Sequence, residues 1–313
     1  MSNKKCIYHT GFLMIYYVCS FAQQDVHFSQ YMFAGTVINP AYVGYRDKVT
    51  TSVLYKKQWS AISSTPVYQH ISVDAPVNYE RMGVGIVMQN DKLFIQISTR
   101  ISALYAYKIN VLKGKLSLGL AAGIKHYKAD LSNLAVFDQD DVVLTQNNHQ
   151  QWSPDFATGC LFQKKNFQAG FSVQHIAQTY ASQYFQNIRH FYFNAAYSVK
   201  VSMHVNVIFS GLLKYLSSQI HQGDATAHLL YNKYLWAGVS YRTNDALAMQ
   251  CGLDAGRLMP QTNIQLKIGY AYEQTISPYR QFNFRNTHEV MLLAAFNKNK
   301  QPENKKHTSP IFF

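Results

Sequence analysis

Residues 95–111 read IQISTRISALYAYKINV, and their side chains alternate in character. Most odd-numbered positions are apolar or aromatic, and most even-numbered positions are polar or small. This period of two is that of a β-strand, whereas an amphipathic helix places apolar residues three and four apart. The stretch therefore predicts a strand of more than ten residues with one apolar face.

The same alternation recurs along the chain. It is clearest in three further stretches, 114–126, 191–202 and 262–273. Weaker copies occupy residues 49–59, 67–76, 82–90, 155–164, 167–175, 203–215, 225–232, 235–242, 247–256 and 288–296. Together they predict about fourteen strands in one domain spanning 49–296. Residues 129–154, which include Asp138, Asp140 and Asp141, are predicted to form a long solvated loop.

Alternation alone fits both a soluble β-sandwich and a membrane β-barrel, since each hides one face. Strand length favours the barrel, because a tilted strand needs about 9–11 residues to cross a bilayer. The non-apolar face is often glycine, which suits a crowded lumen or tight strand curvature. These glycines are Gly83, Gly85, Gly119, Gly123, Gly238, Gly252 and Gly269.

Tyrosines gather toward the strand ends, as in the aromatic girdles of membrane barrels. They are Tyr105, Tyr107, Tyr127, Tyr241, Tyr270 and Tyr272. The predicted fold class is all-β, a transmembrane antiparallel β-barrel of about 14 strands behind a signal peptide. Ile101 and Leu118 are predicted to face lipid, where arginine would cost about 2–4 kcal/mol. Ser102 is predicted to face the lumen and to tolerate arginine better.

Composition agrees with this class. Only 14% of residues are charged, against about 25% in soluble domains. The mean hydropathy of −0.17 argues against a bundle of membrane helices. The net charge of +13 comes from basic residues that are scattered singly or lie near the two ends of the chain. Without a basic stripe or helix, a nucleic-acid partner is disfavoured.

Residues 1–22 have the three parts of a secretory signal peptide. Lys4 and Lys5 supply positive charge, residues 11–19 are apolar, and Ala22 ends a small-x-small cleavage site. We therefore expect export to the outer membrane. The polar tail, residues 297–313, is predicted to lie in the periplasm.

No catalytic, cofactor or metal site is predicted, and the protein is predicted not to be an enzyme. Its 12 histidines lack metal-ligand spacing, and no nucleophile motif such as GxSxG occurs. Cys160 and Cys251, the cysteines outside the leader, each lie within an alternating stretch. We favour the interpretation that they are two small apolar side chains on strands, and we leave open whether they form a disulfide.

The segment before the first strand, residues 23–48, is the most distinctive part of the chain. It contains QDVHFSQYMF over residues 24–33 and INPAYVG over residues 38–44, with no long alternation. Three roles fit it: it plugs the lumen, lies against the periplasmic rim, or holds a partner. The candidate plug or partner-contact residues are Phe28, Ser29, Gln30, Tyr31, Met32, Asn39, Pro40, Ala41, Tyr42 and Gly44.

These two motifs resemble the N-terminus of the PorP/SprF family of Bacteroidota outer-membrane proteins, in which QDxxFSQYM precedes NPAYAG. The chain departs from that pattern at Val43, where the family commonly has Ala, and at Ala34 or Gly35, where it commonly has Asn. Further similar stretches follow in the family's order. They are YKKQW at 55–59, GVG at 83–85 with NDK at 90–92, KLSLGL at 115–120 and NTHE at 286–289.

The resemblance implies a non-enzymatic accessory barrel of type IX secretion and gliding, which helps a particular large secreted protein or adhesin reach or stay on the cell surface. It implies contacts with outer-membrane lipid, the secreted client and secretion or gliding components, among them a peptidoglycan-binding periplasmic protein. Two alternatives stay open. One is a soluble β-sandwich adhesin. The other is a small-solute channel whose wall carries Lys108, Lys125, Lys200, Lys214 and Lys267.

Overall fold

The structure is a computed structural model of the chain. It describes residues 26–46, 48–62, 65–77, 81–129, 150–177, 187–216, 221–258, 264–278, 281 and 284–296. The predicted signal peptide, the polar tail and the acidic residues Asp138, Asp140 and Asp141 lie outside these ranges.

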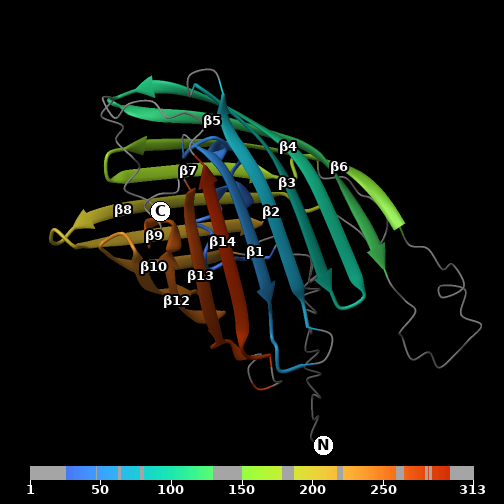
Figure 1. Ribbon diagram of the computed structural model, residues 1–313. Helices are drawn as coiled ribbons and strands as arrows, with labels where there is room; N and C mark the ends of the chain where they lie inside the picture. The colour runs from blue at the N-terminus through green and yellow to red at the C-terminus, as the bar shows by residue number, and fades with distance from the viewer. Residues whose placement is uncertain are drawn as a thin grey trace, which may run out of the picture.

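The described residues form a closed barrel in which each strand pairs with its neighbours in the sequence (Figure 1). The strands are β1 (Val49–Lys57), β2 (Val67–Val77), β3 (Met82–Leu93), β4 (Gln96–Val111), β5 (Gly114–Ala129), β6 (Gln150–Lys164), β7 (Phe167–Gln174), β8 (His190–Lys200), β9 (Val205–Leu216), β10 (His221–Tyr231), β11 (Leu235–Arg242), β12 (Ala246–Asp254), β13 (Ile264–Thr275) and β14 (Thr287–Phe296). Strands β1 and β14 close the barrel in antiparallel register, from Val49 opposite Phe296 to Lys57 opposite His288. The predicted all-β antiparallel barrel is confirmed.

One predicted boundary was wrong. The expected loop over 129–154 is shorter, because β6 begins at Gln150 and pairs with β5 from that residue onward. Strand β6 includes Pro154, although proline lacks the N–H that a strand interior uses. However, β6 pairs with β7 only from Thr158. Pro154 therefore lies where β6 has a strand neighbour on one side.

The two faces of the wall follow the predicted alternation. Ile101 and Leu118 are 41% and 48% exposed and point outward, while Ser102 is 5% exposed and points inward. Most predicted girdle tyrosines with a described exposure also lie outward, but Tyr127 was misassigned. It is buried and donates a hydrogen bond to Asn187 inside the barrel. Cys160 and Cys251 carry free thiols.

The two ends of the barrel differ in their connections. At one end, here called the turn end, the connections are as short as 112–113 and 165–166. At the other, called the loop end, they include 58–66, 130–149 and 175–189. Strand β1 starts and β14 finishes at the turn end.

Helical structure in the described ranges consists of short 3-10 turns. Two precede β1, η1 (Gly35–Val37) and η2 (Pro40–Tyr42), and η3 (Ala255–Leu258) follows β12. Within these ranges, no helix has the length and apolar character needed to cross a bilayer.

Candidate functional site

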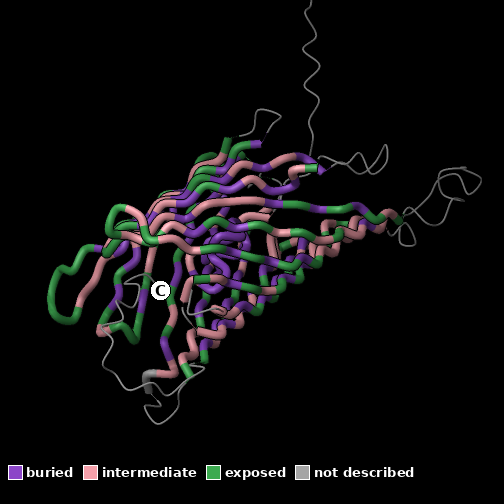
Figure 2. The backbone as a smooth tube through the Cα atoms, turned by 90° about the horizontal axis from the view of Figure 1, so that it is seen from above, coloured by how far each residue is buried: buried purple, intermediate pink, exposed green. Residues whose placement is uncertain are grey.

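Residues 26–46, here called the lumen segment, run through the inside of the barrel. Figure 2 shows buried chain enclosed by the strands. Of the ten candidate residues, nine are buried and Met32 is half-buried. Residues sharing the interior with them belong to strands on all sides of the barrel. The lumen segment therefore occupies the interior of the barrel.

Two carboxylates hold the start of the segment. Glu289 on β14 accepts hydrogen bonds from the backbone N–H groups of Ser29 at 3.0 Å and Gln30 at 2.8 Å. The Ser29 hydroxyl donates to Glu273 Oε1 on β13 at 2.7 Å. Lys56 on β1 donates to the same Glu273 oxygen at 2.7 Å and to the backbone carbonyl of His27. These charges are buried, so each depends on its partners for compensation.

A second group of charges lies beside the first. Arg242 on β11 contacts Glu273 at 3.2 Å and Asp224 on β10 at 3.3 Å. It also donates to the Ser29 hydroxyl at 3.3 Å. Asp224 Oδ2 lies 2.6 Å from His27 Nε2. Burial, followed by the charge of Arg242, lowers the pKa of His27 to about 4 against the opposing effect of Asp224.

Aromatic side chains of the first motif pack inside the barrel next to these charges. The ring of Phe28 meets Tyr68 on β2 edge-on, with centroids 4.6 Å apart. Phe33 packs on Trp236 of β11 at 4.5 Å. The Tyr31 hydroxyl lies 3.4 Å from that of Ser210 on β9. The first motif of the lumen segment is thus wedged between opposite walls, which suits large aromatic side chains with a polar edge.

The second motif is held mainly through polar groups of its backbone and Asn39. Asn39 donates to the carbonyls of Cys160 at 2.9 Å and Phe171 at 3.3 Å, and its own oxygen accepts from the N–H of Ala41. This last bond caps η2, which begins with Pro40 at a position where the missing N–H costs nothing. An Asn-Pro pair therefore starts the turn and anchors it to β6 and β7.

Glycines on the inner wall make room for this motif. A Cβ at Gly119 would overlap the backbone nitrogen of Ala41, and a Cβ at Gly159 would overlap the side-chain oxygen of Asn39. Both positions thus require close approach of the wall to the lumen segment. The predicted crowded lumen is confirmed at these positions, and its crowding comes from the segment itself.

The end of the segment is fixed near the turn end. Gly44 adopts a φ of 64°, and its N–H donates to Asp74 on β2 at 2.8 Å. Lys108 on β4 donates to the carbonyl of Gly44. The Tyr42 hydroxyl accepts from Asn194 on β8 at 2.7 Å, and burial raises the pKa of Tyr42 to about 12.

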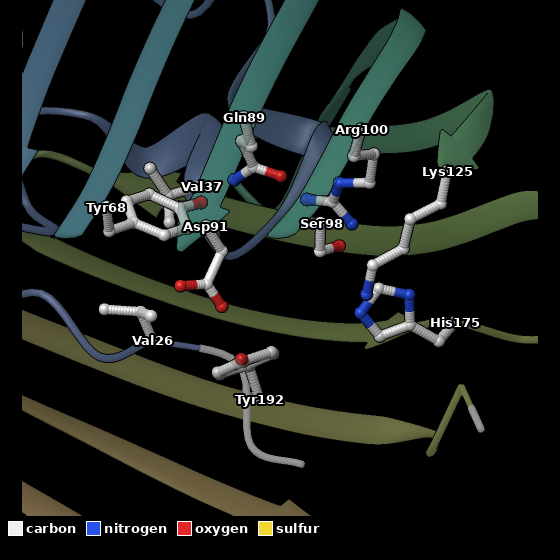
Figure 3. Close-up of a pocket in the computed structure, with 10 residues that line it drawn as sticks. All are labelled: Val26, Val37, Tyr68, Gln89, Asp91, Ser98, Arg100, Lys125, His175 and Tyr192. Carbon is white, nitrogen blue, oxygen red and sulfur yellow. The ribbon is translucent and has the colours of Figure 1, made fainter. Parts of the chain in front are cut away.

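A small pocket remains beside the lumen segment toward the loop end (Figure 3). Its free volume of about 40 Å³ accommodates a few water molecules. One side carries a polar chain in which Asp155 joins Arg100 at 3.1 Å to His175 at 2.7 Å. The pocket is lined by Val26, Val37, Tyr68, Gln89, Asp91, Ser98, Arg100, Lys125, His175 and Tyr192. It is too small for a substrate larger than a few waters.

The lysines of the channel alternative lie at inward positions of their strands, but those with described contacts engage protein groups. Lys108 contacts the lumen segment, and Lys125 lies over the ring of Tyr127 and 3.4 Å from Asn187. Lys214 is 2% exposed. Lysines that make such contacts do not line an open pore. In the described part of the chain, no group of three or more His, Cys, Asp or Glu side chains is arranged to hold a metal.

The barrel partners of the lumen segment were missed in the sequence. Glu289 belongs to the NTHE stretch at 286–289, so its motif was visible but its role was not. Lys56 likewise belongs to the YKKQW stretch at 55–59. Asp224, Arg242 and Glu273 carried a weaker signal, as charged residues at inward positions of a chain poor in charge. Inward-facing buried charges require partners, and here the lumen segment is among those partners.

The fold and this interior define an outer-membrane β-barrel whose lumen is occupied by the chain that precedes its first strand. The chain belongs to the PorP/SprF family. The family model described as "Type IX secretion system membrane protein PorP/SprF" matches residues 20–293.

Solved structures with a similar fold are outer-membrane barrels. The CymD monoaromatic hydrocarbon channel is 10% identical with a TM-score of 0.53, covering 84% of this chain and 92% of its own. A deletion mutant of the TodX monoaromatic hydrocarbon channel is 10% identical with a TM-score of 0.50, covering 84% and 94%. A Pseudomonas aeruginosa FadL homologue is 9% identical with a TM-score of 0.46, covering 83% and 93%. No curated protein matches the sequence significantly.

Proposed function

We propose that this protein is a non-enzymatic accessory barrel of type IX secretion and gliding, which helps a particular large secreted protein or adhesin reach or attach to the cell surface. Membership of the family supports the link to secretion. We further propose that residues 23–48 form a plug, that 49–296 form the barrel, and that secretion or gliding components and a peptidoglycan-binding periplasmic protein are its other partners.

The observation that carries the proposal is the occupied lumen. Glu273 and Glu289 bind the start of the lumen segment, and Asn39 ties its second motif to β6 and β7. A barrel filled in this way acts through the surfaces it presents to other proteins. The lumen segment then supports the rim and loops from inside.

A small-solute channel is the second candidate. Its support is the barrel fold shared with CymD and TodX, which are named as monoaromatic hydrocarbon channels. At 10% identity the likeness extends to the fold alone. Conduction would require the lumen segment to leave its buried contacts.

A comparison of the surface and secreted proteomes of a strain lacking the gene with those of its parent tests the proposal. We expect loss of one or a few large secreted proteins while other export continues. An unchanged proteome together with impaired solute uptake would replace this function with the channel.

The same strain separates the two roles of the candidate residues. Phe28→Ala combined with Tyr31→Ala removes ring contacts inside the barrel. If these residues pack the interior, barrel assembly falls together with client display. If they contact a partner, display is lost while the barrel assembles normally, as judged by its heat-modifiable migration in gels.

A further inference from the structure

The first described residues of the lumen segment lie toward the loop end of the barrel. Val26 lines the pocket with Asp91 and Ser98, which flank the β3–β4 connection, and with His175, which directly follows β7 (Figure 3). The carbonyl of His27 contacts Lys56, the penultimate residue of β1. All these positions border connections at the loop end.

The last residues of the segment lie at the opposite end. Gly44 contacts Asp74 near the end of β2, and its neighbour Val43 lies against Gly83 at the start of β3. Both positions border the β2–β3 connection at the turn end, where β1 also starts. The chain therefore passes through the lumen from the loop end to the turn end before the first strand begins.

The difference between the two ends of the barrel relates the direction of the lumen segment to the two sides of the membrane. Outer-membrane barrels have short periplasmic turns and longer extracellular loops. Apart from 255–263, the connections at the turn end have two to four residues. The loop end has short connections such as 94–95, but it also has the long connections 58–66 and 175–189. The start of β1 and the end of β14 also share the turn end. The loop end is accordingly the extracellular one.

We infer that Val26, the N-terminal end of the lumen segment, lies at the extracellular mouth of the barrel, so that this end of the segment is reached from outside the cell. This inference rests on the proposed function only for the identity of the protein that binds this end of the lumen segment. A protein that binds this end of the segment is then an extracellular polypeptide, such as the secreted client. A periplasmic component instead meets the turn end, near Tyr45 and Arg46, both of which are partly exposed.

An epitope inserted between Gln24 and Asp25 tests the inference in intact cells. Matched insertions in the β3–β4 connection after Phe94, at the loop end, and after Lys113, at the turn end, serve as outside and inside controls. We expect antibody to decorate intact cells carrying the first two insertions. Cells with the Lys113 insertion should require permeabilisation. Heat-modifiability of each variant confirms that the barrel is folded.

A smaller probe covers the case in which an insertion prevents assembly. Val26→Cys, Phe94→Cys and Lys113→Cys are each placed in a Cys160→Ser, Cys251→Ser background and treated with a membrane-impermeant maleimide. We expect labelling of the first two in intact cells and of the third only after permeabilisation. The inference is overturned if position 26 follows position 113, or if positions 94 and 113 exchange their behaviour.

These results are independent of the client. A surface-exposed N-terminal end together with an unchanged secreted proteome would remove the proposed function and leave the topology standing. A lost client together with an N-terminal end on the periplasmic side would do the reverse.

Discussion

The carboxylate of Glu289 accepts a hydrogen bond from the backbone N–H of Ser29, 260 positions earlier in the chain. Its second oxygen accepts from the neighbouring amide of Gln30. One side chain of the last strand thereby satisfies two consecutive backbone donors of the lumen segment. Inside a barrel these donors have few other partners, so Glu289 anchors the start of the lumen segment.

Replacing Glu289 by alanine should release the start of the lumen segment. Each buried N–H left without an acceptor costs about 1–3 kcal/mol. We expect the segment to become sensitive to added protease in detergent while the strands stay resistant, as mass spectrometry of the fragments would reveal. Glu289→Gln keeps one acceptor oxygen and should give an intermediate effect. Equal resistance of Glu289→Ala and the parent would contradict the anchoring role.

A methyl group at Gly119 should displace the second motif. The added Cβ would overlap Ala41, and overpacking of this kind costs about 1–3 kcal/mol. Gly211→Ala is the matched control, because a Cβ there meets its nearest described neighbour at 3.5 Å. In planar bilayers, Gly119→Ala should conduct more current than the parent, and Gly211→Ala should not. Identical conductance for both variants would argue that the motif does not block the lumen.

Arginine on the outer face should destabilise the barrel according to depth. Leu118→Arg lies within the apolar band and should cost about 2–4 kcal/mol of unfolding free energy, whereas Leu112→Arg in the β4–β5 turn should cost about 0–1. Urea unfolding in phospholipid vesicles measures both. Comparable losses would mean that the band is placed wrongly on β5.

The earlier expectation for Ser102 changes with the structure. Ser102 faces inward as predicted, but it is 5% exposed and sits against Gly123. An arginine there has no room, so Ser102→Arg should be as damaging as a lipid-facing arginine. The expectation of tolerance took into account only the face of the strand, whereas the structure shows how tightly Ser102 is packed.

Acid should loosen the start of the lumen segment. His27 has its pKa lowered to about 4 by burial, below the value of about 6.5 in an unfolded chain. When the lumen segment leaves its buried position, His27 therefore binds a proton more readily. The neutral His27 ring stabilises the bound segment fully above about pH 6.5, and this stabilisation is lost as the pH falls through about 4. Protease sensitivity of the segment should rise across this window.

The charged groups that face His27 are Asp224, Arg242 and Lys214. Of these, only the Asp224 carboxylate can take up a proton in acid, since arginine and lysine are already protonated at neutral pH. His27→Gln separates the effects of His27 and Asp224, because it removes the imidazole and leaves the other groups in place. We expect the acid-induced rise in sensitivity to shrink in this variant. A pH profile unchanged by the substitution would assign the effect to the carboxylates of the wall.

The strands could be predicted from the sequence because each must place apolar side chains against lipid at every second position. This is why the four clearest stretches coincide with β4, β5, β8 and β13 to within three residues at either boundary. The alternation also predicts the inward position of Tyr127. It shares the odd-numbered, inward face of β5 with Ser117 and Gly119, so its parity already placed it in the lumen rather than in a girdle.

The contacts of the interior could not be predicted in the same way. Alternation assigns Asp224, Arg242 and Glu273 to the inner face, but it carries no information on which of them meet across the barrel. Ser29 and Glu273 are 244 positions apart, and only closure of the wall brings them together. The lumen segment itself was visible as a motif, while its route from one end to the other required the structure.

Closure of the wall also involves the strands that hold the lumen segment. The residues that bind Ser29 and Gln30 lie on β13 and β14, the last two strands of the barrel in chain order. Strand β14 is also the one that pairs with β1 to complete the wall. The segment that precedes the barrel strands is thus held by the two final strands of the barrel. A chain that stops before β13 lacks both the final seam and these acceptors, so the start of the lumen segment is held in this way only when the wall is complete.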